Sequence, residues 1–219
     1  ATSDAIADAD SCAAITENVS LVADTMIAVA NCQGALHYGP DAFINIGTAI
    51  NSKGLFRFAL SSTQSAAFAA GTVRSLTLAL TRCTNSSCVG AAAAGTLAVF
   101  PMRSDWDEGA ASVAYSGADW CRRTAGSPGT AWNLAGASGA VDVGTTALGS
   151  APVDASQPSV SMTLAPAPAV AWMTQGLLSL QVVPTNGAVF VTWSREAGNA
   201  PPPTLTITYC KPPSDAAAD

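Results

Sequence analysis

The feature that most constrains the fold is a set of three apolar, β-branched runs near the C-terminal end, at residues 177–184, 188–193 and 204–209. In the last run, Leu205, Ile207 and Tyr209 alternate with threonines, and this period of two is typical of a half-buried strand. Asn186 and Gly187 separate the first two runs and predict a β-hairpin, because both central residues of a type I′ turn need positive φ. We therefore expect an antiparallel sheet here.

Shorter apolar runs recur along the chain, with turn residues between them. They predict further strands at residues 20–30, 42–49, 54–60, 72–82, 96–102, 112–115, 140–144 and 159–164. Residues 61–70 are expected to form a connection with one short helical turn, and residues 165–171 a proline-rich connection. Many short strands without βαβ alternation predict an all-β fold, an antiparallel two-sheet β-sandwich (jelly roll) with long disulfide-tethered loops. This domain is expected at 20–210, between an N-terminal arm (1–19) and a C-terminal tail (211–219).

Charged residues are scarce. They make up 11% of the chain, whereas ordinary globular proteins have about 25%. The net charge of −6 argues against nucleic acid as a partner, because nucleic-acid-binding proteins carry basic patches for the phosphates. The longest apolar tract, residues 89–102, is shorter than the ~20 residues that span a bilayer, so no membrane span is expected. A surface of small polar residues suits a secreted protein or one on the extracellular surface.

Six cysteines, without a CxxC pair and with a single histidine, favour three disulfides over a zinc site. Three disulfides imply an oxidising compartment. Counting alone allows fifteen pairings. However, two of the cysteines flank a tight loop, and the first and last strands of a jelly roll often lie together. These two arguments, with the remaining pair by elimination, predict the bridges Cys83–Cys88, Cys12–Cys210 and Cys32–Cys121.

Several short motifs follow one another in a characteristic order. They are Ala23-Asp24-Thr25-Met26-Ile27, Tyr38-Gly39, Phe43-Ile44-Asn45-Ile46-Gly47, Leu55-Phe56-Arg57-Phe58-Ala59-Leu60, Asp105-Trp106-Asp107-Glu108-Gly109, Ser112-Val113-Ala114-Tyr115, Ser194-Arg195-Glu196 and Pro203-Thr204-Leu205-Thr206-Ile207-Thr208-Tyr209. In this order the chain resembles, over about residues 20–210, the DNRLRE-type domain of secreted bacterial proteins. That domain is a jelly roll related to alginate-binding carbohydrate-binding modules, so the resemblance implies a sandwich and polysaccharide binding. Asp107 is inserted before Glu108, and Tyr115 stands where the family commonly has Trp, so no particular sugar is implied.

A loop-rich segment carries most of the candidate ligand-binding residues, which are Trp106, Tyr115, Trp120, Arg122, Arg123 and Trp132. Aromatic rings stack on sugar rings, and guanidinium groups bind carboxylates, so this set would suit an anionic polysaccharide. The alternative is that the tryptophans pin the loop to the sandwich. Packing is the favoured interpretation, because large aromatic side chains are more often buried anchors.

The same segment holds one dense acidic cluster, Asp105, Asp107 and Glu108. Clustered carboxylates are natural Ca²⁺ ligands, so these three are the candidate metal ligands, and calcium is the one cofactor considered. A glycosidase pair is a weaker alternative, and a solvated acidic loop is favoured over both. Near the end of the chain, Arg195 and Glu196 are expected to form a structural ion pair.

Nothing in the sequence specifies catalysis. The single histidine, His37, has no evident partner for a catalytic triad, and the cysteines are expected to be oxidised. We therefore expect a non-catalytic extracellular sandwich that binds polysaccharide or another cell-surface component. The alternative is a self-assembling structural subunit of an extracellular fibre, coat or matrix, because poorly charged surfaces suit subunit contacts.

Overall fold

Antiparallel pairing organises the computed structural model, which describes residues 12–29, 38–39, 41–85, 88, 92–110, 116–126, 129–171 and 173–210. The strands are β1 (Ala14–Ala28), β2 (Phe43–Gly47), β3 (Ser52–Ala59), β4 (Val73–Thr81), β5 (Gly95–Met102), β6 (Gly149–Val153), β7 (Ser159–Leu164), β8 (Leu177–Thr185), β9 (Val189–Trp193) and β10 (Thr204–Cys210). The helices are α1 (Ser62–Ala69), α2 (Pro166–Val170) and the 3₁₀ turn η2 (Arg195–Ala197).

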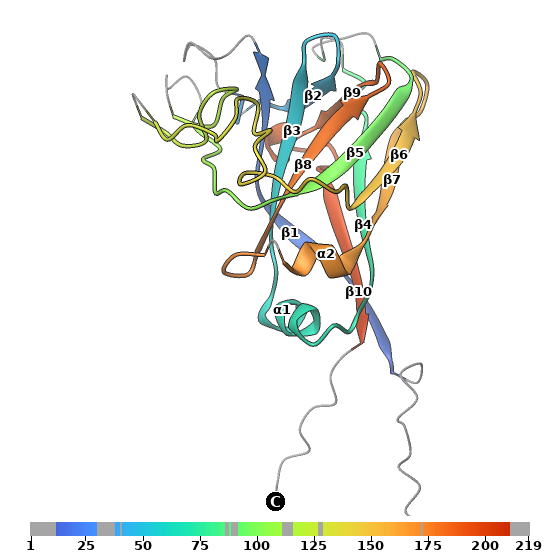
Figure 1. Ribbon diagram of the computed structural model, residues 1–219. Helices are drawn as coiled ribbons and strands as arrows, with labels where there is room; N and C mark the ends of the chain where they lie inside the picture. The colour runs from blue at the N-terminus through green and yellow to red at the C-terminus, as the bar shows by residue number, and fades with distance from the viewer. Residues whose placement is uncertain are drawn as a thin grey trace, which may run out of the picture.

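The strands form one large sheet in the order β6-β5-β8-β3-β1-β10-β4-β7, and β2 branches from β3 to pair with β9. The two terminal strands of this order, β6 and β7, lie next to each other, so the sheet nearly closes into a barrel (Figure 1). The all-β, antiparallel class predicted from the sequence is confirmed. The separation into the two sheets of a jelly roll stays a prediction.

Strand β1 connects the two halves of the barrel. Its first part pairs with β10, from Ala14 opposite Cys210 to Val19 opposite Leu205. Its second part pairs with β3 from Ser20 onward, after which the register shifts between Leu21 and Ala23. The predicted start of this strand at residue 20 was therefore six residues late, and the irregular arm predicted for residues 1–19 is a paired strand from residue 14 onward. Most side chains in that part are polar and exposed, so the strand could not be predicted there from apolar runs.

The predicted hairpin at Asn186-Gly187 is half right. Both residues have positive φ, 54° and 83°, as the turn requires. However, β8 and β9 do not pair, because β3 and β5 already occupy both edges of β8. Strand β9 therefore crosses over to pair with β2. The backbone conformation of the turn could be predicted from the sequence, but the pairing of the strands depends on the rest of the sheet.

Three other predictions need correction. Residues 140–144 form turns and one isolated bridge, not a strand, whereas β6 was not predicted. Its Gly-Ser-Ala-Pro composition has low strand propensity, and its proline is tolerated because β6 ends the hydrogen-bonded strand order. The connection at 61–70 contains a two-turn helix with a capping box between Ser61 and Gln64, and the one at 165–171 is the short helix α2. The strand predicted at 112–115 lies outside the described residues.

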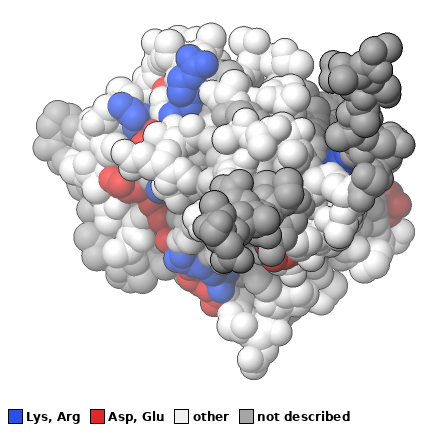
Figure 2. All heavy atoms as spheres, turned by 90° about the horizontal axis from the view of Figure 1, so that it is seen from below, with Lys and Arg blue, Asp and Glu red and all other residues white. Residues whose placement is uncertain are grey.

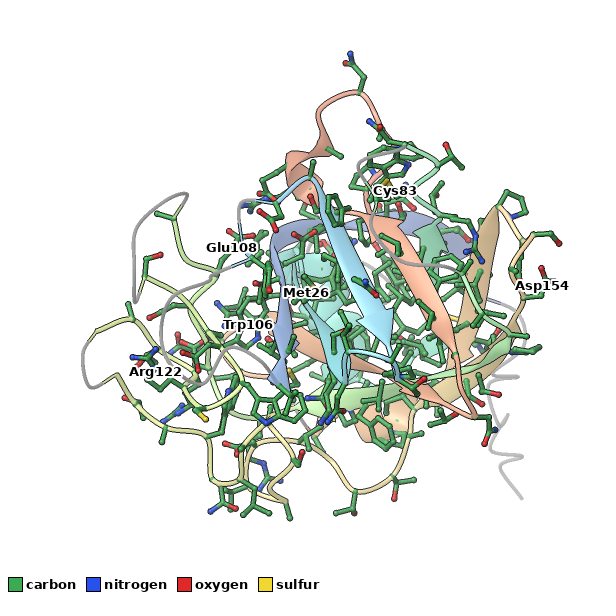
Figure 3. The ribbon with its side chains drawn as sticks, turned by 90° about the horizontal axis from the view of Figure 1, so that it is seen from above. Met26, Cys83, Trp106, Glu108, Arg122 and Asp154 are labelled. Atoms are coloured by element: carbon green, nitrogen blue, oxygen red, sulfur yellow. A yellow bond between two sulfur atoms is a disulfide. The ribbon has the colours of Figure 1, made fainter. Side chains whose placement is uncertain are left out.

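The buried side chains form two clusters on opposite faces of the sheet. The larger cluster fills the barrel and includes Phe56, Phe58 and Phe190. The smaller one lies between the outer face of β1 and β3 and the long segment 103–148, and it contains Ile27 and Trp106 (Figure 3). Residues 23–28 of β1 are therefore buried on both faces, which explains their unbroken run of buried positions.

Two predicted disulfides are present. Cys12 is bonded to Cys210, which ties the start of β1 to the end of β10, and Cys83 is bonded to Cys88. Cys121 is also disulfide-bonded, but Cys32, its predicted partner, lies outside the described residues. Disulfides of this kind are typical of an oxidising, extracellular environment. None of the described helices is long and apolar enough to cross a membrane.

Candidate functional site

The tryptophans of the long segment mostly serve packing. Trp106 is fully buried and Trp132 is 4% exposed, so neither ring offers a face to a sugar. The indole Nε1 of Trp132 donates a hydrogen bond to the carbonyl oxygen of Asp119 at 2.8 Å. Both rings belong to the cluster that fixes the segment on the sheet. Tyr115 lies outside the described residues.

Trp120 is half-buried, and its ring is covered by two neighbours. Gly136 packs directly on the ring, where a Cβ atom would lie 2.6 Å from Trp120 Cζ2, and its φ of +73° also favours glycine. The Nζ atom of Lys53 lies 5.4 Å from the ring centroid in a cation–π contact. Trp120 is therefore a third packing anchor of the segment, after Trp106 and Trp132.

Arg122 and Arg123, the two candidate ligand-binding arginines, contact other residues of the segment. Arg122 forms an ion pair with the buried Asp119, from Nη2 to Oδ2 at 2.5 Å, and the same carboxylate accepts the backbone N–H groups of Arg122 and Cys121. Arg123 donates to the carbonyl oxygen of Asp105 at 3.3 Å. The paired Arg122 does not offer an open guanidinium for an anionic ligand.

The structure separates the three predicted calcium ligands. Asp105 pairs with Arg57, and Oδ2 of Asp107 accepts the backbone N–H of Ala125 at 2.6 Å. Glu108 turns instead toward β1 and accepts the backbone N–H of Asp24 at 2.7 Å. The three carboxylates thus have three different partners, and the predicted cluster does not form one site.

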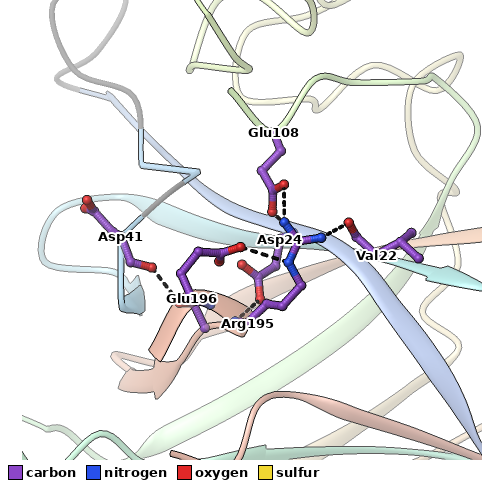
Figure 4. A network of polar contacts seen from close by, with 7 residues as sticks. Val22, Asp24, Asp41, Glu108, Arg195 and Glu196 are labelled. Atoms are coloured by element: carbon purple, nitrogen blue, oxygen red, sulfur yellow. Dashed lines mark hydrogen bonds and ion pairs between the residues drawn. The ribbon is translucent and has the colours of Figure 1, made fainter. Parts of the chain in front are cut away.

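Glu108 belongs to a different group, which we call the Asp24 cluster: Asp24, Glu108, Arg195 and Glu196 (Figure 4). Arg195 lies at its centre. Its Nη2 is 2.6 Å from Glu108 Oε2, its Nε is 2.8 Å from Glu196 Oε1, and its backbone N–H donates to Asp24 Oδ2 at 2.8 Å. The predicted ion pair between Arg195 and Glu196 is therefore present, as one contact of a larger network.

Local structure explains how the cluster assembles. Ser194 caps η2 by accepting the backbone N–H of Glu196, which places Arg195 and Glu196 over β1. Gly39 allows the segment around Glu108 to approach, because a Cβ atom there would lie 1.9 Å from the Glu108 carbonyl oxygen. The Ser194-Arg195-Glu196 and Ala23-Asp24 motifs are recognisable in the sequence, but nothing in their spacing indicates that they meet.

Burial perturbs the acids of this cluster. It raises the pKa of Asp24 to about 8, against the opposing effect of the backbone hydrogen bond from Arg195. The charges of Glu196 and Glu108 raise the same pKa further. Burial also raises the pKa of Glu108, whereas its hydrogen bond from Asp24 and the charge of Arg195 lower it. A pKa of about 8 means that Asp24 keeps its proton at neutral pH, because burial and the neighbouring carboxylates together favour its neutral form.

A groove of about 540 Å³ lies where β1, β10 and the start of α1 meet. We call it the Glu17 groove; its polar lining consists of Glu17, Asn18, Ser20, Ser61, Thr63, Gln64 and Tyr209. It lies at the α1 end of the molecule, the lower end in Figure 1, away from the long segment at 103–148. This groove was not predicted from the sequence, because its residues come from the start of one strand, a helix cap and the last strand.

The carboxylate of Glu17 is held in a fixed position. Gln64 Nε2 and the hydroxyl of Tyr209 both donate to its Oε2 atom, each at 3.1 Å. Within the described part of the chain, no hydrogen bond reaches its Oε1 atom. Asn18 Oδ1 accepts from the Thr206 hydroxyl at 3.0 Å, which leaves the Asn18 amide N–H groups as donors. The groove thus offers a fixed acceptor, amide donors and hydroxyl groups.

A smaller cavity of about 240 Å³ lies beside Lys53 and Gln181. Lys53 Nζ donates to the Gly136 carbonyl oxygen at 2.7 Å and to the Ser138 hydroxyl at 3.0 Å. Burial lowers the pKa of this amine to about 8. Lys53 thereby fastens the segment at 136–138 to β3.

A scan of the sequence against protein-family models finds no match, and a search of the curated proteins finds none either.

Proposed function

We propose that this chain is a non-catalytic module that binds a neutral polysaccharide in the Glu17 groove. The observation that carries the proposal is the Glu17 carboxylate, held by Gln64 and Tyr209 in a groove of about 540 Å³. Sugar hydroxyls donate to carboxylates and accept from amides, so the lining of this groove is chemically complementary to them.

The charge distribution favours a neutral ligand over an anionic one. The protein carries a net charge of −6, and the groove itself contains a carboxylate. Arg122, which the sequence suggested for an anionic sugar, is occupied by Asp119. An acidic polysaccharide would therefore meet repulsion at the groove, whereas a neutral one would not.

A binding role without turnover fits the same groove. Glycoside hydrolysis by the usual mechanism needs two carboxyl groups about 5–9.5 Å apart. Among the described residues that line the groove, Glu17 is the one carboxylate. We therefore extend the proposal to the absence of hydrolysis by this module.

Glycan-array binding of the purified, disulfide-intact chain tests the proposal. We expect neutral oligosaccharides to bind and the Glu17→Gln variant, which keeps the side-chain shape but removes the charge, to lose that binding. Asp107→Asn is the matched control, because Asp107 is an exposed carboxylate in the long segment. Binding confined to acidic glycans, or binding unchanged in Glu17→Gln, would contradict the proposal.

The proposal also includes an extracellular location for the protein and a two-sheet jelly roll as its fold. The Cys12–Cys210 and Cys83–Cys88 disulfides fit action outside the cell. The motif order that resembles the DNRLRE-type domain supports a two-sheet jelly roll and a carbohydrate-binding role.

One observation favours a second function, that of a structural subunit of an extracellular fibre, coat or matrix. Seen from below, most of the visible surface is uncharged, with a few small groups of charged side chains (Figure 2). Weakly charged surfaces can be buried in subunit contacts. Light scattering of the native protein distinguishes the two, because a binding module is expected to stay at the mass of one chain, 21.9 kDa, while a subunit assembles.

A further inference from the structure

The Asp24 cluster has an unbalanced charge. Three carboxylates, those of Asp24, Glu108 and Glu196, surround one guanidinium, that of Arg195. Asp24 is fully buried and, with a pKa of about 8, holds a proton at neutral pH in the ion-free protein. Once all groups are ionised, as in a cation-bound form, the cluster carries two excess negative charges. Buried charges are rarely left without a partner, because removal from water is costly unless an opposite charge compensates it.

Two carboxylate oxygen atoms of the cluster have no hydrogen-bond partner. Asp24 Oδ1 and Glu196 Oε2 are both buried and neither accepts a hydrogen bond, although Arg195 satisfies the other oxygen of each carboxylate. One oxygen each of Asp24, Glu108 and Glu196 lie within 4.8 Å of one another. In the ion-free protein a proton on Asp24 can be shared with Glu196. Ionised carboxylate oxygens can only accept, so once Asp24 loses that proton the two oxygens need a positive centre between them.

We propose that the Asp24 cluster binds one divalent cation of the calcium class, in a site distinct from the Glu17 groove. Ca²⁺ prefers carboxylate oxygens and tolerates irregular coordination, so three carboxylates with water in the remaining positions form a suitable ligand set. One such ion would balance the two excess charges and supply the partner that Asp24 Oδ1 and Glu196 Oε2 lack.

The site would join three parts of the chain that are distant in sequence. Asp24 comes from β1, Glu108 from the segment at 103–148, and Glu196 from η2 (Figure 4). Arg195 already links them by hydrogen bonds, including one from its Nη1 to the carbonyl oxygen of Val22. A bound ion would therefore stabilise the attachment of the long segment and η2 to the sheet.

Calorimetric titration of the EDTA-treated protein with CaCl₂, together with thermal melts, tests the inference. We expect binding with a Kd of about 0.1–1 mM, the range of extracellular calcium modules, and a higher melting temperature in CaCl₂ than in EDTA. Asp24→Asn and Glu196→Gln should each weaken binding at least about tenfold, because calcium affinity depends on the number of charged ligands. Glu196→Gln changes a side chain that is 25% exposed, so it also serves if Asp24→Asn does not fold.

Asp107→Asn is the matched control, since this carboxylate neighbours Glu108 but contacts Ala125 instead of the cluster. It should bind calcium like the unchanged protein. The inference is overturned if about 10 mM CaCl₂ gives neither heat nor a melting shift, since this exceeds the weakest expected Kd tenfold. It is equally overturned if Glu196→Gln binds as tightly as the unchanged protein, or if Asp107→Asn alone loses binding.

Discussion

Glu108 accepts the backbone N–H of Asp24 at 2.7 Å, and this contact joins the long segment at 103–148 to the doubly buried part of β1. Glu108 is therefore part of the framework that holds the segment, not a member of an exposed acidic loop. The tryptophans of the segment have the same role, because they fill the space between it and the sheet. This arrangement separates the stabilising part of the molecule from the Glu17 groove at the other end.

Trp132→Ala is expected to destabilise the protein strongly without affecting polysaccharide binding. The substitution removes a ring that is 4% exposed, together with the hydrogen bond to Asp119, and such truncations cost about 3–5 kcal/mol. Chemical denaturation measures the loss, and glycan binding at a temperature where the variant is folded measures the function. A stable variant that has lost binding would show that the ring contacts the sugar.

Lys53 should give the protein a pH-dependent stability at alkaline pH. Its pKa is about 8 in the folded state and 10.5 in the unfolded state, so between these values the unfolded chain binds a proton that the folded chain lacks. The free energy of unfolding should therefore rise with pH from about 8 to about 10.5, by at most about 3 kcal/mol. Below pH 8 both states are protonated and this contribution is constant.

Lys53→Met provides the comparison, because it keeps the aliphatic chain but cannot titrate. Urea denaturation across this pH range should show a smaller rise for the variant than for the unchanged protein. Equal slopes for the two proteins would mean that the amine titrates normally in the folded state.

The Cys12–Cys210 and Cys83–Cys88 disulfides should differ in their contribution to stability. Cys12 and Cys210 are 198 residues apart, whereas Cys83 and Cys88 are separated by five. In the chain-entropy description, closing the long loop stabilises by about 5 kcal/mol and the short one by about 2 kcal/mol. Replacing both members of each pair with serine and measuring the melting temperatures checks the order. A larger loss for the Cys83–Cys88 pair would contradict it.

Sequence patterns predicted what depends on neighbours along the chain. Strand β7 matches its predicted range, 159–164, because its apolar side chains alternate strictly, and the Asn186-Gly187 turn has the predicted backbone conformation. Long-range choices could not be read in this way. Strand β9 pairs with β2 because β8 has no free edge, and the Gly-Ser-Ala-Pro run of β6 becomes a strand only because β5 lies beside it.

The same limit applies to the candidate sites. A cluster that is dense in sequence, at Asp105, Asp107 and Glu108, is dispersed by the fold. Glu17 and Tyr209 lie 192 positions apart in sequence, yet they meet because β1 pairs with β10. Prediction of the groove would have required the register of that pairing, which the first part of β1 does not reveal through apolar alternation.

The most direct test of the central claim is a calorimetric titration of one neutral oligosaccharide that binds on the array, into three proteins. These are the unchanged chain, Glu17→Gln in the groove and Arg123→Ala in the long segment. We predict that Glu17→Gln weakens binding at least about tenfold, because a hydrogen bond to a charged group contributes about 1.5–3 kcal/mol, while Arg123→Ala leaves the Kd unchanged. Loss of binding in Arg123→Ala, with an unchanged Kd in Glu17→Gln, would contradict the account.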